Sequence, residues 1–513
     1  MIDVWLRNIT SRLSKQSKWA FVAAFIIGLL VHSFIFLNHY HTHDSFSNIH
    51  EEQNKTASGR FFLQYASMWS SYFDLPWVNG VFSLFYLSVV ALLIVILLDI
   101  QKNSTAIVIG GVVVAFPTVT STFSYMFTAD GYMLGILVAI SALVVTKLWH
   151  YGWLVGILLT YISVGIYQAN LTIILAFICV FALQQLLIKG HSVKALFVQS
   201  GQMLIVFTGG MALYLIHYKI YQMQGLIVSY QGLDTAGIPS LSEMWALRYT
   251  IHEQMLKFFF EGLYTVGALR TWDFLHIVLA MLLILFTVYF SVQQKLYKHV
   301  GKLLLTCIII ALIPIAYYAV YFTSGDVQYH MLMVYANVTV YVLALCFFDK
   351  VDVSMRMPIK IAASTTWLSV IAVVINFGII ANIAYFNMNI KYEKSFALAD
   401  RVLMRIEALE NYHEVKNIAV LGYTRLHSPL TSIDIPEAIP SITGSSGEIF
   451  LPTSFHYQKL YDVYYGVQLK AADAQQIERI QKTTQFKQMD VWPNASSVQV
   501  IDGTAVVKFR EMD

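Results

Sequence analysis

Long apolar runs of about 20 residues, separated by short polar connections, recur along most of this chain. A run of this length lets a helix cross the hydrocarbon core of a bilayer while pairing its own backbone N–H and C=O groups. Only 12% of the residues are charged, compared with about 25% in a typical soluble domain. The sequence therefore predicts a mainly α-helical, polytopic membrane protein with about eleven transmembrane helices. The runs lie approximately at 19–37, 81–98, 105–123, 131–148, 152–166, 169–188, 196–217, 273–291, 303–322, 329–348 and 362–384.

The first apolar run follows a basic stretch that includes Arg12, Lys15 and Lys18. It is longer than the apolar core of a signal peptide, and bulky residues follow it where a cleavage site needs small ones. We therefore expect a retained membrane helix with its start in the cytoplasm.

The charges of the connections predict which side of the membrane each one faces. The short connections expected outside, around 118–128, 167–170 and 323–328, contain no lysine or arginine. This pattern predicts a multi-pass protein of the cell membrane with a cytoplasmic N-terminus and an extracytoplasmic C-terminal part. The basic residues of the connections expected inside are Lys102, Lys147, Lys189, Lys194, Lys295, Lys298, Lys302, Lys350, Arg356 and Lys360.

Two domains are expected from the change in composition along the chain. Residues 1–386 form the transmembrane domain, with large outer loops at 38–79 and 221–272, each expected to contain interfacial helices such as 61–73. Residues 387–513 form an extracytoplasmic α/β domain. Its expected elements are helices at 393–409 and 473–484, a buried strand at 417–423, and a hairpin of 498–501 with 505–509 across Asp502-Gly503.

Two carboxylates are the first candidates for catalysis. Asp44 follows the first apolar run, and Asp130 begins the fourth, so both are expected at the outer side of the membrane. A charge at this depth is costly unless it has a function. One carboxylate can accept the proton of an acceptor hydroxyl while the other orients the substrate. The alternative for Asp130, which precedes Gly131, is a turn or a helix cap.

Polar residues near the same side are candidates for binding. Arg60 can hold a phosphate by two parallel hydrogen bonds, or it can contact lipid headgroups. His330 can help bind phosphate, and Asp326 lies beside it; the alternative for His330 is an ordinary interfacial histidine. Gln168 and Asn170 can bond sugar hydroxyls, although hydrogen bonding between helices is the role that the sequence favours for them.

Other site classes receive less support. No metal is predicted for the reaction, with a divalent metal near His41, His43 and Asp44 left as an alternative. All three cysteines fall in apolar runs, which argues against disulfides and thiolate metal sites. No basic patch with interleaved aromatic residues indicates nucleic-acid binding.

Several short motifs follow one another along the chain: Asp44, Gly59-Arg60-Phe61-Phe62, Phe116-Pro117, Thr128-Ala129-Asp130-Gly131, Ile166-Tyr167-Gln168-Ala169-Asn170, Val500-Ile501-Asp502-Gly503 and Val506-Val507-Lys508. These motifs resemble those of bacterial Gtr-type glucosyltransferases, which modify O-antigens and other surface polysaccharides. Phe61 stands where the related motif more often has tryptophan, and Asp44 stands alone where several relatives have paired acids. These departures leave the sugar and the partner carboxylate open.

The resemblance implies a C-type glycosyltransferase fold and an inverting transfer of a hexose, expected to be glucose. The donor would be a polyprenyl-phosphate sugar, the acceptor a cell-surface polysaccharide or glycan, and Asp44 the base. It also implies a functional link to a donor synthase and a flippase, contact with membrane lipid, and no cofactor. The alternatives are a transporter or flippase for a lipid-linked saccharide, or a structural or sensor protein; a transporter fold usually contains internal repeats and broken helices.

Overall fold

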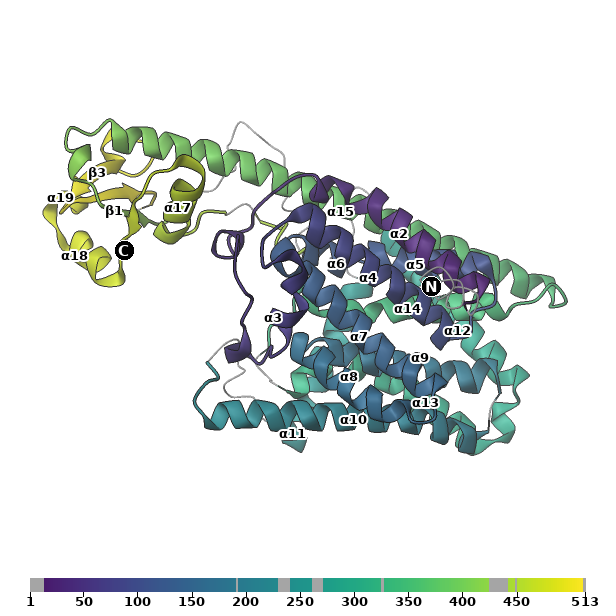
Figure 1. Ribbon diagram of the computed structural model, residues 1–513. Helices are drawn as coiled ribbons and strands as arrows, with labels where there is room; N and C mark the ends of the chain where they lie inside the picture. The colour runs from purple at the N-terminus through teal and green to yellow at the C-terminus, as the bar shows by residue number, and fades with distance from the viewer. Residues whose placement is uncertain are drawn as a thin grey trace, which may run out of the picture.

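The computed structural model describes residues 13–190, 192–228, 240–260, 271–323, 327–423, 442–447 and 450–510. Most of these residues form a bundle of long helices, and a smaller part with a β-sheet, called the C-terminal domain after the prediction, lies at one end of it (Figure 1). The helices of the bundle are α2 (Lys15–Phe36), α3 (Leu63–Ala66), α4 (Pro76–Leu97), α5 (Asn103–Ala115), α6 (Pro117–Phe123), α7 (Ala129–Leu148), α8 (Gly152–Ile166), α9 (Asn170–Leu183), α10 (Val193–Met223), α11 (Leu241–Phe260), α12 (Thr271–Gln293), α13 (Val300–Tyr317), α14 (Val338–Lys350) and α15 (Met357–Glu407).

Eight of the described helices are long and apolar enough to cross a membrane, or nine if α5 and α6 form one span bent by 41°. The bend falls at Pro117, whose ring cannot continue the hydrogen-bond ladder of α5. The expected runs at 152–166 and 329–348 correspond to the shorter helices α8, with 15 residues, and α14, with 13 residues. The membrane character is therefore confirmed, whereas the count of eleven spans stays a prediction.

Helix packing in the bundle combines apolar contacts with a few buried polar bonds. α2 packs against α4 and α5, and α7 packs against α4 and α8. His32 of α2 is fully buried, with Nδ1 2.6 Å from the Tyr385 hydroxyl of α15 and Nε2 2.9 Å from the Val114 carbonyl of α5. Such a bond between helices is favoured in lipid because an unpaired polar group there is costly.

Helix α15, with 51 residues, continues from the bundle into the C-terminal domain (Figure 1). The expected boundary at residues 386 and 387 therefore lies inside one continuous helix, and the division into two domains stays a prediction. The expected helix at 393–409 is the last part of α15.

The C-terminal domain contains a four-stranded sheet in the order β2-β1-β4-β3, with β1 parallel to β2 and β4, and β3 antiparallel to β4. The predicted strand, the hairpin across Asp502-Gly503 and the helix beginning near Asp473 are confirmed. The elements are β1 (Asn417–Leu421), α17 (Ser454–Leu460), β2 (Lys470–Ala471), α18 (Ala474–Lys482), α19 (Thr484–Lys487), β3 (Val498–Ile501) and β4 (Thr504–Lys508).

The loop at 38–79, named the first outer loop after its predicted side of the membrane, differs from expectation. In place of an interfacial helix over 61–73, the chain forms the four-residue helix α3, the 3-10 turn Met68–Ser70 and irregular turns. Ser71 and Tyr72 both have positive φ values, which end helical geometry there. Phe61 is 4% exposed and stacks on His217 of α10, with ring centroids 4.0 Å apart. The loop is therefore folded onto the bundle, although Tyr65 and Trp69 remain exposed.

The basic connections lie at the opposite end of the bundle from this loop. Asp130 is in the first turn of α7 and Lys147 in its last turn. The Lys147 and Lys189 ammonium groups lie 2.8 and 2.6 Å from the Asp99 carboxylate. These charges anchor one end of the bundle, the end that the positive-inside rule predicts to be cytoplasmic.

Cysteine labelling tests this orientation. We expect cysteines introduced at Ser47 and Ser446 to react with an impermeant thiol reagent added outside the cell, and a cysteine at Ser104 not to react. The background should lack Cys307, which is exposed on α13. Labelling at Ser104 but not at Ser446 would reverse the orientation.

Candidate active site

A cavity of about 740 Å³ opens between the first outer loop, the bundle and the C-terminal domain. Asp44, Arg60 and His330, which lie far apart in the sequence, all line it. Among the described residues, the lining contains one carboxylate, from Asp44, and two permanent cations, from Lys55 and Arg60. The cavity is therefore suited to hold an anionic group beside a single carboxylate.

A tight turn brings Arg60 into the cavity wall. Gly59 has φ +74°, and a Cβ on this residue would lie 2.7 Å from the Tyr214 hydroxyl and 3.0 Å from Gln168 Nε2. The position therefore requires glycine both for its conformation and for space. The Arg60 amide donates to the Lys55 carbonyl at 3.2 Å, so both cations of the cavity come from one turn.

Two tyrosines of the bundle orient the Arg60 side chain. Arg60 Nη1 donates to the Tyr132 hydroxyl at 3.1 Å, and its guanidinium carbon lies 5.4 Å from the centre of the Tyr167 ring. The two rings are stacked, with centroids 4.6 Å apart. This arrangement places Arg60 in the cavity wall, and a guanidinium over an aromatic ring is held in a defined plane.

His330 lies in the non-helical segment before α14, outside the membrane-spanning helices. Its Nδ1 is buried and has no hydrogen-bond partner among the described residues. Burial, together with the positive charge of Arg60, lowers the pKa of His330 to about 4. At neutral pH the ring is therefore uncharged and can donate one N–H to a ligand.

Asp44 lies at the start of a 3-10 turn, and its side chain makes no capping bond with that turn. Its carboxylate is about half exposed and lies 3.5 Å from His43 Nε2. The backbone is fixed by Asn48, whose side-chain amide donates to the Asp44 carbonyl at 2.8 Å, and Gln53 holds Asn48 in turn. The carboxylate is thus accessible from the cavity while the chain that carries it is held.

The C-terminal domain contacts this loop both before and after Asp44. His41 Nε2 is hydrogen-bonded to the Tyr464 hydroxyl, and Phe46 packs against Phe450 with ring centroids 5.3 Å apart. Phe46, although part of the first outer loop, belongs to the hydrophobic core of the C-terminal domain. The domain therefore positions Asp44.

A segment of the C-terminal domain, residues 442–447, also reaches the cavity. Thr443 lines the cavity and accepts a hydrogen bond from the Met331 amide at 3.2 Å. Lys391 Nζ donates to the Gly444 carbonyl at 3.0 Å, and the Ser445 and Ser124 hydroxyls are 2.5 Å apart. The cavity is consequently shared between the bundle and the C-terminal domain.

His456 of α17 is a further contribution of the C-terminal domain. Its ring centroid lies 6.4 Å from that of His43, next to Asp44. Burial, followed by the nearby His43, lowers the pKa of His456 to about 4. At neutral pH the His456 ring is therefore uncharged, and it lies beside His43 and close to Asp44.

Asp130 is not brought to the cavity lining. It is completely buried, and its Oδ1 accepts hydrogen bonds from Asn79 of α4 at 3.2 Å and from the Gly131 amide at 2.9 Å. Gly131 allows close packing, because a Cβ there would lie 2.4 Å from Ser67 Oγ. In this position Asp130 joins α4 to α7 and supports the first outer loop.

The two amides expected to bind sugar make internal contacts. Gln168 Nε2 donates to the Ser58 carbonyl at 2.8 Å and so supports the turn that carries Arg60. Asn170 is 2% exposed and donates to the Ser163 carbonyl of α8 at 3.0 Å. Asp326 lies outside the described residues.

Lys55, Tyr132 and Thr443 are cavity residues that sequence reasoning missed. A signal existed for Lys55, which is a second cation close to Arg60 on the side where the short connections avoid positive charge. Nothing local marks Tyr132 or Thr443, because their positions depend on the packing of distant segments.

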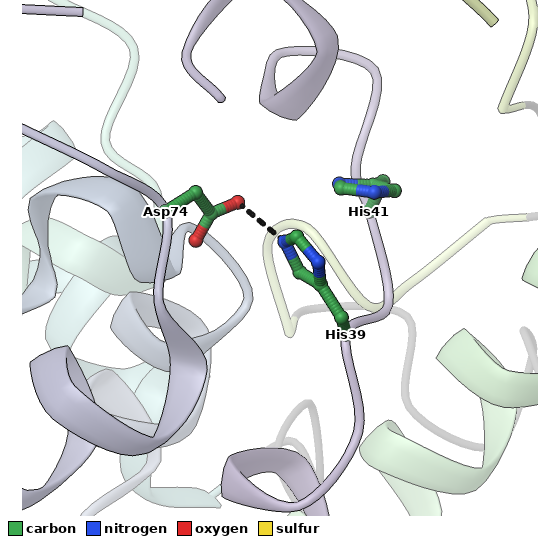
Figure 2. Close-up of side chains that lie close together, drawn as sticks. All are labelled: His39, His41 and Asp74. Carbon is green, nitrogen blue, oxygen red and sulfur yellow. Dashed lines mark hydrogen bonds and ion pairs between the residues drawn. The ribbon is translucent and has the colours of Figure 1, made fainter. Parts of the chain in front are cut away.

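The histidines after α2 separate into two groups. His43 faces the cavity with Asp44, whereas His41 lies with His39 and Asp74 in a cluster whose possible ligand atoms are all within 4.8 Å of one another (Figure 2). The sequence suggested His41, His43 and Asp44 as possible metal ligands. Among the described residues, His41 instead lies with His39 and Asp74.

Comparison with known proteins identifies the family of the chain. A family model described as glucosyl transferase GtrII matches residues 33–348, which is more than half of the chain and includes Asp44, Arg60 and His330. No curated protein and no solved structure matches the chain. The matched range covers the first outer loop and every part of the bundle that lines the cavity, and on this evidence the chain belongs to the GtrII glucosyl transferase family.

Proposed function

We propose that this membrane glucosyltransferase moves a hexose, glucose by its family, from a polyprenyl-phosphate sugar to a cell-surface glycan. The single observation that carries the proposal is the cavity that Asp44, Arg60 and His330 line together. A carboxylate can accept a proton from a hydroxyl, and a guanidinium suits a phosphate. Membership of the GtrII family favours this bond-forming chemistry over transport of a lipid-linked saccharide.

The proposed reaction is one displacement at the anomeric carbon. Asp44 accepts the proton of an acceptor hydroxyl as that oxygen forms a bond to the anomeric carbon. The bond from that carbon to the phosphate oxygen breaks, and the electron pair leaves with the polyprenyl phosphate. Attack from the face opposite the leaving group inverts the anomeric configuration.

Charge develops on the phosphate as the bond breaks. Arg60 and Lys55 both line the cavity and supply positive charge, and neutral His330 supplies an N–H donor. Groups fixed in advance around a developing charge stabilise a transition state more than mobile water does. The orientation of Arg60 by Tyr132 and Tyr167 is of this kind.

The glycan profile of a deletion strain tests the proposed function in cells. We expect the strain to lack one hexose substituent of its surface glycan, wild-type protein to restore it, and the Asp44→Asn variant to be present in the membrane without restoring it. An unchanged profile in the deletion strain, with an altered distribution of lipid-linked saccharide across the membrane, would instead indicate transport.

A further inference from the structure

The cluster of His39, His41 and Asp74 lies beside the cavity but outside its lining. His39 and His41 follow α2, and Asp74 immediately precedes the N-terminal part of α4. Figure 2 shows the two imidazole rings next to each other and the carboxylate directed at His39. The ring centroids are 4.2 Å apart, and His39 Nε2 lies 3.2 Å from Asp74 Oδ2.

Two buried atoms of the cluster have no hydrogen-bond partner among the described residues. They are Nδ1 of His41, a residue with 0% exposure, and Oδ1 of Asp74, a residue with 5% exposure. Burying such atoms without a partner is unfavourable, so their presence together in one cluster points to a ligand. Each of these atoms has an electron pair that it can supply to a cation.

The other nitrogen of His41 is already engaged. His41 Nε2 is hydrogen-bonded to the Tyr464 hydroxyl of the C-terminal domain. Histidines that bind a metal through one nitrogen usually donate the other N–H to a neighbouring oxygen, which fixes the tautomer. Tyr464 is placed to do this, and Nδ1 is then the nitrogen left for a metal.

We propose that His39, His41 and Asp74 bind one divalent transition-metal ion of the zinc type. Two imidazoles and a carboxylate suit such an ion better than calcium or magnesium, which prefer oxygen ligands. Ligand atoms around a tetrahedral zinc are about 3.4 Å apart, so the separation of up to 4.8 Å has to shorten on binding. His39, with its side chain 39% exposed, can move, and its open side admits the ion and a water as fourth ligand.

The bound ion would connect three parts of the chain. It would link the residues just after α2 to the residues just before α4. Through His41 it would also stabilise the hydrogen bond with Tyr464 of the C-terminal domain. His41 is close in sequence to Asp44, so the site would help to hold the loop that carries the proposed base. The inference concerns metal binding and stands apart from the identity of the donor or acceptor.

Zinc binding to the full-length protein in detergent tests the proposal. After treatment with a chelator, the protein is titrated with Zn²⁺ by calorimetry and with Co²⁺ by its ligand-field absorption. We expect one ion per chain, a weakening of more than about 100-fold in His39→Ala and Asp74→Asn, and a weakening of about 10-fold in Tyr464→Phe. The matched control is His50→Ala, a nearby histidine that stacks on Phe73 and lies outside the cluster; it should bind as the wild type does.

The variants separate loss of a ligand from loss of the fold. Asp74 is buried and its replacement can unfold the protein, whereas His39 is partly exposed and Tyr464→Phe removes one hydroxyl only. Thermal melting of the wild type should rise when zinc is added, and that of His39→Ala should not. Absence of saturable binding in the wild type, or equal affinity in the wild type and His39→Ala, would overturn the proposal.

Discussion

Replacement of Asp44 by asparagine is expected to lower turnover by about 10²–10⁴-fold, the usual contribution of a general base. Asparagine keeps the size of the side chain but cannot accept the proton. The Asp44 side chain makes no capping bond and is about half exposed, so its replacement should leave the melting temperature and the affinity for the donor nearly unchanged. The measurement is single-turnover transfer in detergent, with melting recorded on the same preparation.

The control is Asp130→Ala in the same assay. Asp130 is buried and accepts hydrogen bonds from Asn79 and Gly131, so its loss should cost about 1–3 kcal/mol of stability. The fraction that remains folded should retain turnover. More than half of wild-type activity in Asp44→Asn, together with inactive but folded Asp130→Ala, would assign the base to Asp130.

Arg60→Lys is expected to lower kcat/KM for the lipid-linked donor by about 10–100-fold, equivalent to loss of one hydrogen bond to a charged group. Lysine keeps the charge but loses the planar arrangement of donors and the contact with the Tyr167 ring. The measurement is transfer rate against donor concentration. The matched control is Arg401→Lys, an exposed residue of α15 whose guanidinium carbon lies 5.2 Å from the centre of the Trp492 ring; this change should leave both kinetic constants unchanged.

The structural alternative for Arg60 predicts a different pattern. Arg60 also donates to Tyr132, so the side chain can matter for the fold of the loop. A lower melting temperature with a proportionate loss of activity would make Arg60 a structural residue. Unchanged kinetics at an unchanged melting temperature would remove it from the active site.

The helices could be predicted from the sequence because the signal for each one is local. In lipid, a long apolar run has to pair its own backbone N–H and C=O groups, which favours a helix. The hairpin across Asp502-Gly503 is indicated by its own turn residues. Asp44 and Arg60 could be singled out because each is a charge at the expected outer mouth of the bundle. The structure places both at one cavity with His330.

The rest of the candidate site depends on contacts between distant segments. Phe61 was expected at a lipid interface, but packing against α10 buries it and the surrounding chain cannot remain one helix. The sequence around Asp130 does not distinguish a carboxylate that lines a cavity from one that is buried between helices. The hydrogen bond from Asn79 of α4 shows that Asp130 is buried between helices. The contacts of Phe450 and Tyr464 with the loop that carries Asp44 could not be predicted from the sequence, because they depend on how the C-terminal domain packs against the loop.

The most direct test of the central claim is transfer of label by purified protein. The protein is supplied with an acceptor glycan and either polyprenyl-phosphate glucose or a nucleotide-linked glucose, each labelled in the sugar. The account predicts label in the glycan from the lipid-linked donor only, with inverted anomeric configuration and with no transfer by Asp44→Asn. Equal transfer from the nucleotide donor, or full transfer by folded Asp44→Asn, would contradict it.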